Sequence, residues 1–407
     1  MIDREEYLNQ LMEWKDQPVM KVISGVRRGG KSTLLAAYRD RLLQSGVRGN
    51  QILWMDFDEL QEDQKQDTEG LIRAIESHLC RGRKNYLFFD EIEAFTNFQP
   101  ILSVFSGRED LDIYLISSSV YGFEQELSTY FSRQYVKMEV YPCSFQEYVN
   151  HTKRNLNQAL IEYLKYGGFP FLTQGARQEG LFESYMEGSY CTILWKELEN
   201  RQNWRQDTSK SRNINMLSLM KAIAEYIAKM QGEMISVRSV TAAMKEQGRN
   251  VSPNTVSEYM DALLDAHIFY AVERYDMVNK QLLKANKKWY VVDLGLRNFI
   301  MKDKDQKLDA WLEQMVAFQL MRQGFSLTVG KYGKQTNSFI ATKEDSRAYY
   351  QIAAQFADEG AFKEILKPLK RLKDHYAKVV LTMDVDRVGD YDGIRVVSIL
   401  DWLLQKE

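Results

Sequence analysis

An apolar run at residues 19–23 leads into Gly25-Val26-Arg27-Arg28-Gly29-Gly30-Lys31-Ser32, and a helix-forming stretch follows it. These eight residues fit the spacing G-x-x-x-x-G-K-[ST], in which glycines let backbone N–H groups close around phosphate oxygens. The helix that begins beside them directs its positive N-terminal end at the same anion. The pattern therefore predicts an α/β fold in which a strand, a phosphate loop (residues 25–32) and a helix bind a nucleotide.

Individual roles follow from the same motif. Lys31 is expected to reach the β- and γ-phosphates, and Ser32 is expected to hold Mg²⁺. The predicted nucleotide-contacting residues are Gly25, Val26, Arg27, Arg28, Gly29, Gly30, Lys31, Ser32 and Thr33. A chance glycine-rich turn is the alternative, and the strand-then-helix context argues against it.

A second apolar run ends in two carboxylates, in the segment Asn85-Tyr86-Leu87-Phe88-Phe89-Asp90-Glu91. Ligands of parallel α/β sheets lie at the carboxyl ends of the strands. We expect Asp90 to support Mg²⁺ and Glu91 to polarise the attacking water, because phosphoryl transfer depends on positioning and charge stabilisation. The alternative is a solvated acidic loop after a core strand.

Composition limits the function classes that the chain can belong to. Its 407 residues are enough for two to four domains, and a net charge of −2 gives no overall attraction to nucleic acid or membrane. No segment resembles a signal peptide or reaches the 18 apolar residues of a membrane helix. Three dispersed cysteines, at positions 80, 143 and 191, offer neither a zinc site nor a disulfide framework. We expect a cytoplasmic protein.

Strand-like runs alternate with helical patterns through the first 150 residues, which is typical of a parallel sheet covered by helices. The expected strands are residues 19–23, 52–57, 86–90, 113–117 and 135–140. The fourth strand ends in Ser117-Ser118-Ser119, where Ser117 would sense the γ-phosphate or the attacking water. A serine run is often only a turn, so this role depends on the neighbouring motifs.

This ordered series resembles the prokaryotic AAA+-superfamily ATPases that carry a C-terminal domain of unknown function. The segments that carry the resemblance are residues 25–32, 88–91, 117–119, 132–133, 141–148, 166–170, 192–194 with Arg201, 274–276, 290–298 and 401–404. The resemblance implies ATP and Mg²⁺ as ligands and leaves a homo-oligomer open. It also implies that Arg133 faces a phosphate or a neighbouring subunit. A surface ion pair is the alternative for Arg133, and Ser132 stands where the family has glycine.

Residues 213–284 are expected to form a winged helix-turn-helix, with helices at 216–230, 237–244 and 256–264 and a strand at 268–272. In such a fold the third helix can lie in the major groove of DNA. Here it carries Glu258, Asp261 and Asp265 without a lysine or arginine, so it would attract phosphates poorly. A protein-packing module is the alternative, and the basic residues that could contact a DNA backbone follow at Lys280, Lys284, Lys287 and Lys288.

Residues 285–407 are expected to begin with a helix at 308–323 and to continue with strands at 326–330, 338–342 and 349–353. In the family this region resembles a restriction endonuclease, whose metal site needs a helix Glu, a strand Asp and a strand Lys. Glu313 and Gln351 are present, but Ser338 stands in place of the Asp and Ala353 in place of the Lys. Without the central carboxylate, Mg²⁺ cannot be held for cleavage. We expect a catalytically inactive domain.

The sequence thus predicts an ATPase domain (residues 1–152), a helical lid or linker (153–212), the winged helix (213–284) and the endonuclease-like domain (285–407). The predicted function is ATP hydrolysis coupled to a DNA or protein partner through residues 213–407. Two alternatives remain, a nucleotide-binding regulatory protein with negligible hydrolysis and a DNA-processing enzyme.

Overall fold

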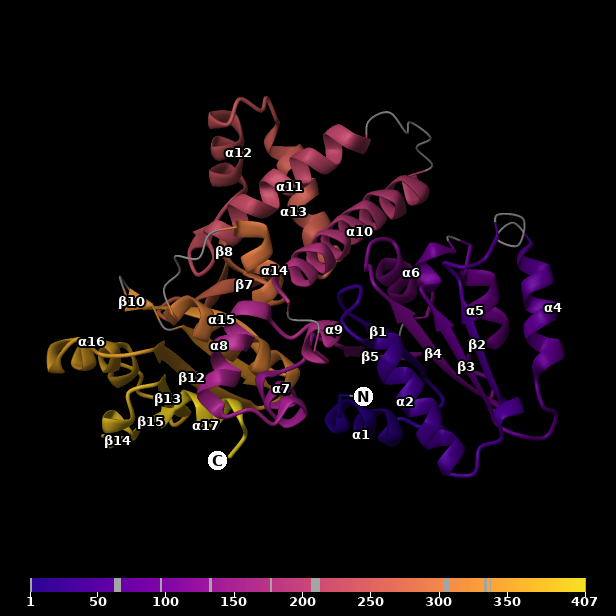
Figure 1. Cartoon of the computed structure of the whole chain (residues 1–407), viewed down its shortest axis with the longest axis horizontal. Coiled ribbons are helices and arrows are strands. Elements are labelled where there is room, and N and C mark those ends of the chain that lie inside the picture. The colour runs from indigo at the N-terminus through magenta and orange to yellow at the C-terminus, as the bar shows by residue number, and fades with distance from the viewer. Residues whose placement is uncertain are drawn as a thin grey trace. The chain divides into compact units, whose positions relative to one another are not determined.

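The structure is a computed structural model that describes residues 2–61, 67–95, 97–131, 134–175, 178–205, 213–302, 308–332, 335–336 and 338–406 (Figure 1). The chain forms two compact units. Unit 1 comprises Met1–Pro142, Glu187–Ser218 and Asp265–Ile268, and unit 2 comprises Cys143–Met186, Leu219–Leu264 and Phe269–Glu407.

Unit 1 contains a sheet of five parallel strands in the order β2-β3-β4-β1-β5. The strands are β1 (Met20–Ser24), β2 (Ile52–Asp56), β3 (Asn85–Asp90), β4 (Leu111–Ser117) and β5 (Tyr135–Glu139). All five predicted strands are confirmed to within two residues at each end. Because β4 lies between β1 and β3, the residues that follow these three strands meet at one edge of the sheet.

Helices cover both faces of this sheet, as Figure 1 shows. They are α1 (Glu5–Glu13), α2 (Lys31–Gln44), α4 (Thr68–His78), α5 (Gln99–Phe105) and α6 (Phe123–Tyr130). Aromatic and aliphatic side chains of α4, α5 and α6 pack on one face, and those of α1 and α2 pack on the other. A parallel sheet buried on both faces needs continuous apolar strands, and β3 and β4 are buried throughout. The long helix α10 (Glu179–Arg205) contributes its part from Glu187 onward to unit 1.

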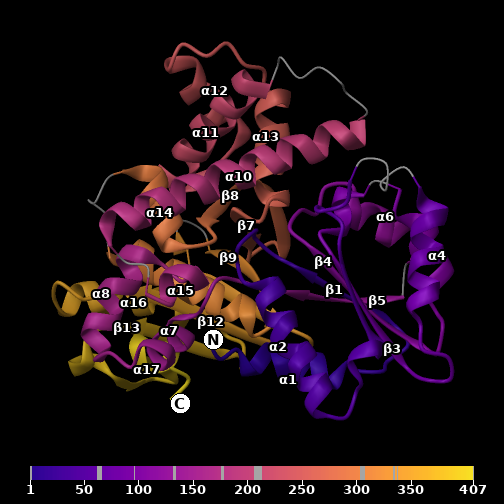
Figure 2. The same cartoon turned by 45° about the vertical axis from the view of Figure 1, so that its right-hand side comes forward.

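Unit 2 contains most of the remaining helices and all of the remaining strands. Its helices include α7 (Phe145–Thr152), α8 (Leu156–Tyr166), α9 (Pro170–Thr173), α12 (Val237–Glu246), α14 (Leu294–Met301), α15 (Leu308–Arg322), α16 (Glu359–Lys370) and α17 (Ile399–Leu403). Helices α11 (Asn213–Lys229) and α13 (Pro253–Asp265) also belong mainly to this unit. Figure 2 shows α11, α12 and α13 grouped beside β7 and β8. The three helices predicted between residues 216 and 264 are confirmed.

The strands of unit 2 form one mixed sheet in the order β14-β15-β13-β12-β11-β9-β7-β8-β6, with β10 paired to β9. They are β6 (Met234–Ile235), β7 (Phe269–Asp276), β8 (Gln281–Val291), β9 (Ser326–Tyr332), β10 (Gln335–Thr336), β11 (Phe339–Lys343), β12 (Ser346–Ala353), β13 (Ala377–Thr382), β14 (Gly389–Tyr391) and β15 (Ile394–Ser398). The predicted boundary at residue 284 falls within β8, and β7 pairs with β9 in parallel. The strands after α13 are therefore continuous with the C-terminal sheet.

Candidate nucleotide-binding site

The phosphate loop joins β1 to α2, and its backbone explains its glycines. Gly25 has φ 142° and Gly30 has φ 99°, conformations that glycine adopts at little cost. A Cβ added to Gly25 would lie 2.2 Å from the carbonyl oxygen of Val140. Helix α2 begins at Lys31, directly after Gly30, so its first N–H groups open towards the loop. The loop therefore has the geometry that phosphate binding needs.

Lys31 is folded back over the loop and is only 4% exposed. Its Nζ donates to the carbonyl oxygens of Gly25 (2.8 Å) and Val26 (3.1 Å) and to Ser118 Oγ (2.9 Å). Burial lowers the pKa of Lys31, and the nearby charge of Glu91 opposes that shift. The ammonium group is thus already positioned within the loop, held by neutral acceptors that a phosphate can replace.

Asp90 ends β3 beside the start of α2. Burial raises the pKa of Asp90 to about 6, and a hydrogen bond with the Ser32 side chain acts in the opposite direction. Asp90 Oδ1 is buried and, among the described residues, lacks a hydrogen-bond partner. Mg²⁺ prefers oxygen ligands, and an unpaired carboxylate oxygen next to a hydroxyl fits that preference. Asp90 and Ser32 are therefore a suitable pair of ligands for the predicted ion.

Glu91 follows directly and has a left-handed backbone, with φ 50° and ψ 43°. This conformation costs a non-glycine residue roughly 1 kcal/mol or more, and such strain is frequent at functional sites. Its carboxylate accepts from Arg27 Nη2 at 2.8 Å and from Ser118 Oγ at 2.6 Å. The loop, the end of β3 and the end of β4 thus converge on this one side chain.

The serines after β4 have distinct positions. Ser117 Oγ donates to the carbonyl oxygen of Ser119 at 2.6 Å, whereas Ser118 contacts both Lys31 and Glu91. We predicted Ser117 as the sensing residue, and the structure places Ser118 between the cation and the carboxylate. Hydrogen-bond geometry distinguishes neighbouring serines, and the sequence alone does not.

Two buried glutamates extend this network, and the sequence analysis did not include them. Glu93 is 2% exposed and accepts from the backbone N–H groups of Ser118 (2.7 Å) and Ser119 (3.2 Å). Burial, followed by the charge of Glu91, holds the pKa of Glu93 well above its usual value. The spacing Glu91-x-Glu93 was a usable signal for this residue.

Glu197 lies on α10 and accepts from Ser119 Oγ at 2.7 Å and from Arg201 Nε at 2.7 Å. Arg201 also pairs with Asp265 at the end of α13. Burial raises the pKa of Glu197 to about 7, although Arg201 opposes the shift. Its only sequence signal was the helical i, i+4 spacing with Arg201.

Three other predicted site residues, Thr33, Arg28 and Arg133, say less about the nucleotide site. Thr33 is an exposed residue in the first turn of α2, and Arg28 donates to Ser189 Oγ at 2.8 Å. Arg133 lies outside the described residues. Its predicted role therefore stays a prediction.

Glu313 of α15 is the helix glutamate that the sequence marks in unit 2. Glu313 Oε1 accepts from Tyr290 Oη at 2.6 Å and pairs with Lys288 Nζ at 2.6 Å. Gln351 Oε1 accepts from the backbone N–H of Ser338 at 3.1 Å. Within the described ranges, no three His, Cys, Asp or Glu residues are grouped so that they could hold a metal ion. Glu313 Oε1 and Gln351 Oε1 are each hydrogen-bonded to other residues of unit 2.

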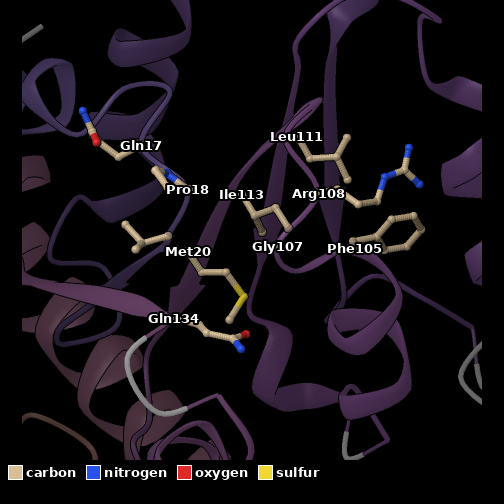
Figure 3. Close-up of a pocket in the computed structure, with 10 residues that line it drawn as sticks. Gln17, Pro18, Met20, Phe105, Gly107, Arg108, Leu111, Ile113 and Gln134 are labelled. Carbon is tan, nitrogen blue, oxygen red and sulfur yellow. The ribbon is translucent and has the colours of Figure 1, made fainter.

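A shallow pocket in unit 1 lies away from the nucleotide site (Figure 3). It is lined by Gln17, Pro18, Val19, Met20, Phe105, Gly107, Arg108, Leu111, Ile113 and Gln134. Met20 and Leu111 begin β1 and β4, whereas the phosphate loop follows the other end of β1. The pocket is therefore at the opposite edge of the sheet and is not part of the candidate site.

Two family models match the chain. Residues 17–149 match a model described as an AAA domain, and residues 157–307 match a domain of unknown function, DUF8612. The first match includes the phosphate loop, Asp90, Glu91 and the three serines. The predicted AAA-type P-loop fold is thereby confirmed for this segment. None of the helices among the described residues combines the length and hydropathy needed to span a membrane.

The chain is also similar to other proteins and to solved structures. An uncharacterized protein of Haemophilus influenzae is 32% identical over 411 residues, spanning 100% of this chain and 99% of that protein. Uncharacterized protein MJ1544 of Methanocaldococcus jannaschii is 24% identical over 327 residues, spanning 75% of this chain and 67% of that protein. A Walker-type ATPase of Pyrococcus abyssi is 14% identical with a TM-score of 0.46, covering 74% of this chain and 96% of that chain. AMPPCP-bound DnaA from Aquifex aeolicus is 14% identical with a TM-score of 0.30, covering 64% and 86%.

Proposed function

The chain belongs to the same protein family as the Haemophilus influenzae relative and carries an AAA domain, and on this premise we propose that it binds Mg²⁺·ATP and hydrolyses it. One observation carries the proposal. Lys31 of the phosphate loop and Glu91 after β3 meet at Ser118 after β4, so three separate motifs form one cluster. Such convergence at the carboxyl edge of a parallel sheet supports a nucleotide site.

Each residue of the cluster has a defined task. The backbone N–H groups of the phosphate loop and Lys31 bind the β- and γ-phosphates. Asp90 and Ser32 would hold Mg²⁺, which offsets phosphate charge when bound. Glu91 orients the attacking water and accepts its proton, and Ser118 holds the Glu91 carboxylate in place.

A nucleotide-binding regulatory protein with negligible turnover is the second candidate. The observation that favours it is that both oxygens of Glu91 are already engaged, one with Arg27 and the other with Ser118. A carboxylate with both oxygens held by donors is less available to a water molecule than a free one. Turnover then requires that Glu91 leave at least one of these partners.

For the C-terminal half we propose a winged helix and an inactive endonuclease-like domain that couple the ATPase to a partner. The order α15, β9, β11, β12, α16, β13, with β12 and β13 parallel, supports the second assignment. The ion pair of Glu313 Oε1 with Lys288 supports inactivity, since a cation already occupies one oxygen of this carboxylate. The acidic face of α13 favours a protein partner over DNA.

Steady-state phosphate release, measured with and without double-stranded DNA, tests the function and separates the alternatives. An ATPase releases phosphate in a Mg²⁺-dependent way, and a regulatory nucleotide-binding protein binds ATP without appreciable release. A DNA-processing enzyme is stimulated by DNA and alters it. Lys31→Ala is the control, because phosphate release that persists in that variant comes from a contaminating enzyme.

A further inference from the structure

The side chain of Arg27 has a placement that the phosphate-loop motif does not require. The motif specifies the glycines, Lys31 and Ser32, and leaves the third position open. Arg27 Nη2 nevertheless donates to Glu91 Oε2 at 2.8 Å, and Nη1 lies 3.4 Å from Asp58 Oδ2. The side chains of Arg27 and Glu91 are 19% and 12% exposed. A cation of the loop is therefore paired with the proposed catalytic base in a partly dehydrated setting.

The contacts around this pair form a chain through the candidate site. Lys31 donates to Ser118, Ser118 donates to Glu91, and Glu91 accepts from Arg27. Two loop cations are thus linked through a single carboxylate. The side chain that binds Arg27 is the one that must be free to orient water.

We propose that Arg27 distinguishes ATP from ADP by exchanging the Glu91 carboxylate for the γ-phosphate. This inference rests on the proposed nucleotide site. A guanidinium group binds phosphate oxygens through two parallel N–H donors, and the γ-phosphate carries more charge than a carboxylate. The exchange releases Glu91 from its cation only when a γ-phosphate is present. With ADP, Arg27 keeps Glu91 as its partner.

Asp58 explains why this exchange does not leave a second carboxylate unpaired. Asp58 Oδ1 pairs with Lys196 of α10 at 2.8 Å, while its other oxygen faces Arg27. When Arg27 turns to the γ-phosphate, Lys196 still neutralises Asp58. A partly buried charge without a partner would be costly, so Lys196 lowers the barrier to the movement of Arg27.

The test compares ATP and ADP affinities by calorimetric titration in the presence of Mg²⁺, using wild type and Arg27→Ala. We expect the wild-type protein to prefer ATP and the variant to lose about 10-fold of that preference, the value of one charge-assisted hydrogen bond. ADP affinity should change by less than about 3-fold, because ADP does not recruit Arg27. If Arg27→Ala does not fold, Arg27→Gln replaces it in the test. Arg27→Gln keeps a hydrogen-bond donor for Glu91 but removes the charge, and we expect the same loss of preference for ATP.

Arg39→Ala is the matched control, because it removes the same charge from α2, outside the phosphate loop, where the Arg39 side chain contacts Asp40. It should leave the ratio of ATP to ADP affinity at the wild-type value, even if both affinities fall. Equal losses for ATP and ADP in the Arg27 variants, or an unchanged ratio, would overturn the proposal. A wild-type protein that binds neither nucleotide would instead refute the proposed function.

Discussion

Each unit contains a carboxylate that the sequence marks for metal chemistry, and the surroundings of the two carboxylates differ. Asp90 of unit 1 has a buried oxygen that lacks a hydrogen-bond partner among the described residues. Glu313 of unit 2 is held by Tyr290 and Lys288, each at 2.6 Å. A buried polar atom left without a partner is costly, so the first arrangement persists where a ligand completes it. In the second arrangement, Oε1 of the carboxylate already has two partners from the protein.

The other residues that could bind a metal beside Asp90 and beside Glu313 differ as well. Glu91 follows Asp90 in the chain, and the Ser32 side chain is hydrogen-bonded to Asp90. Unit 1 therefore supplies several oxygen atoms at the end of β3. In unit 2 the side-chain oxygens of Gln351 and Ser338 already accept hydrogen bonds, from the backbone N–H groups of Ser338 and Ile352 respectively. The comparison teaches that an acidic residue indicates a metal site only where its neighbours leave an oxygen available.

Replacing Glu91 and Glu313 by Gln gives the largest expected difference in ATP turnover between the two units. Glu91→Gln should lower ATP turnover by about 10²-fold or more, the usual effect of losing a positioned general base, while ATP binding persists. Glu313→Gln should leave ATP turnover within about 2-fold of wild type, since Glu313 belongs to unit 2 and the proposed ATPase site belongs to unit 1. Phosphate release under saturating ATP measures both, and near-normal turnover of Glu91→Gln would assign the water-orienting role to another residue.

Glu197 provides a pH-dependent test of unit 1. Its folded-state pKa of about 7 lies above the unfolded value, so the folded protein binds the proton more tightly. The free energy of unfolding should therefore fall as pH rises from about 4.5 to 7, by on the order of 2 kcal/mol.

Glu197→Gln should remove this part of the pH dependence while keeping an acceptor for Ser119. Urea denaturation of wild type and variant at pH 5 and pH 7.5 measures the difference. Identical pH dependence in both proteins would show that Glu197 is ionised throughout the range.

A smaller effect distinguishes two serines of unit 1. Ser118→Ala removes the hydroxyl that contacts Lys31 and Glu91, so we expect turnover to fall about 10-fold. Ser117→Ala removes hydrogen bonds to the backbone carbonyl and N–H groups of Ser119, which touch neither Lys31 nor Glu91, so its effect on turnover should be weaker. If Ser117→Ala lowers turnover more, Ser117 is the sensing residue, as the sequence predicted.

The smallest expected effects concern unit 2 and nucleic acid. We expect no cleavage of DNA or RNA with Mg²⁺ or Mn²⁺. If DNA binds at low salt, replacing Lys284, Lys287 and Lys288 by Ala would flatten the salt slope by up to about three units if each met a phosphate.

The structure lowers that expectation for two of these lysines, because Lys287 pairs with Glu273 and Lys288 with Glu313. We therefore expect Lys288→Ala alone to leave the salt slope of DNA binding unchanged. Nuclease products that disappear in Glu313→Ala would show that unit 2 has an active metal site after all.

Local patterns were sufficient to predict much of the fold. The five strands of unit 1 are short apolar runs, and glycines at positive φ fix the phosphate loop, so both features are visible in neighbouring residues. The pairing of β7 with β9 is a long-range contact that periodicity does not encode. The predicted domain boundary at residue 284 falls inside β8, which spans Gln281–Val291.

The candidate site divides in the same way. Asp90 and Glu91 follow an apolar run and were predicted, because their position depends on one strand. The choice of Ser118 over Ser117 depends on side-chain direction after β4. Glu197 comes from α10, far along the chain, and only folding brings it to Ser119. Tertiary contacts such as those of Glu197 and Ser118 therefore could not be predicted from local sequence patterns, and the role of Ser117 stays a prediction.

Calorimetric titration of the protein with ATP in the presence of Mg²⁺, for wild type and Lys31→Ala, tests whether unit 1 is a nucleotide site. We expect wild type to bind one ATP and Lys31→Ala to lose about 1.5–3 kcal/mol of binding free energy, with thermal unfolding showing that the variant is folded. Equal ATP affinities for the two proteins, or no binding by wild type, would contradict the assignment of the phosphate loop.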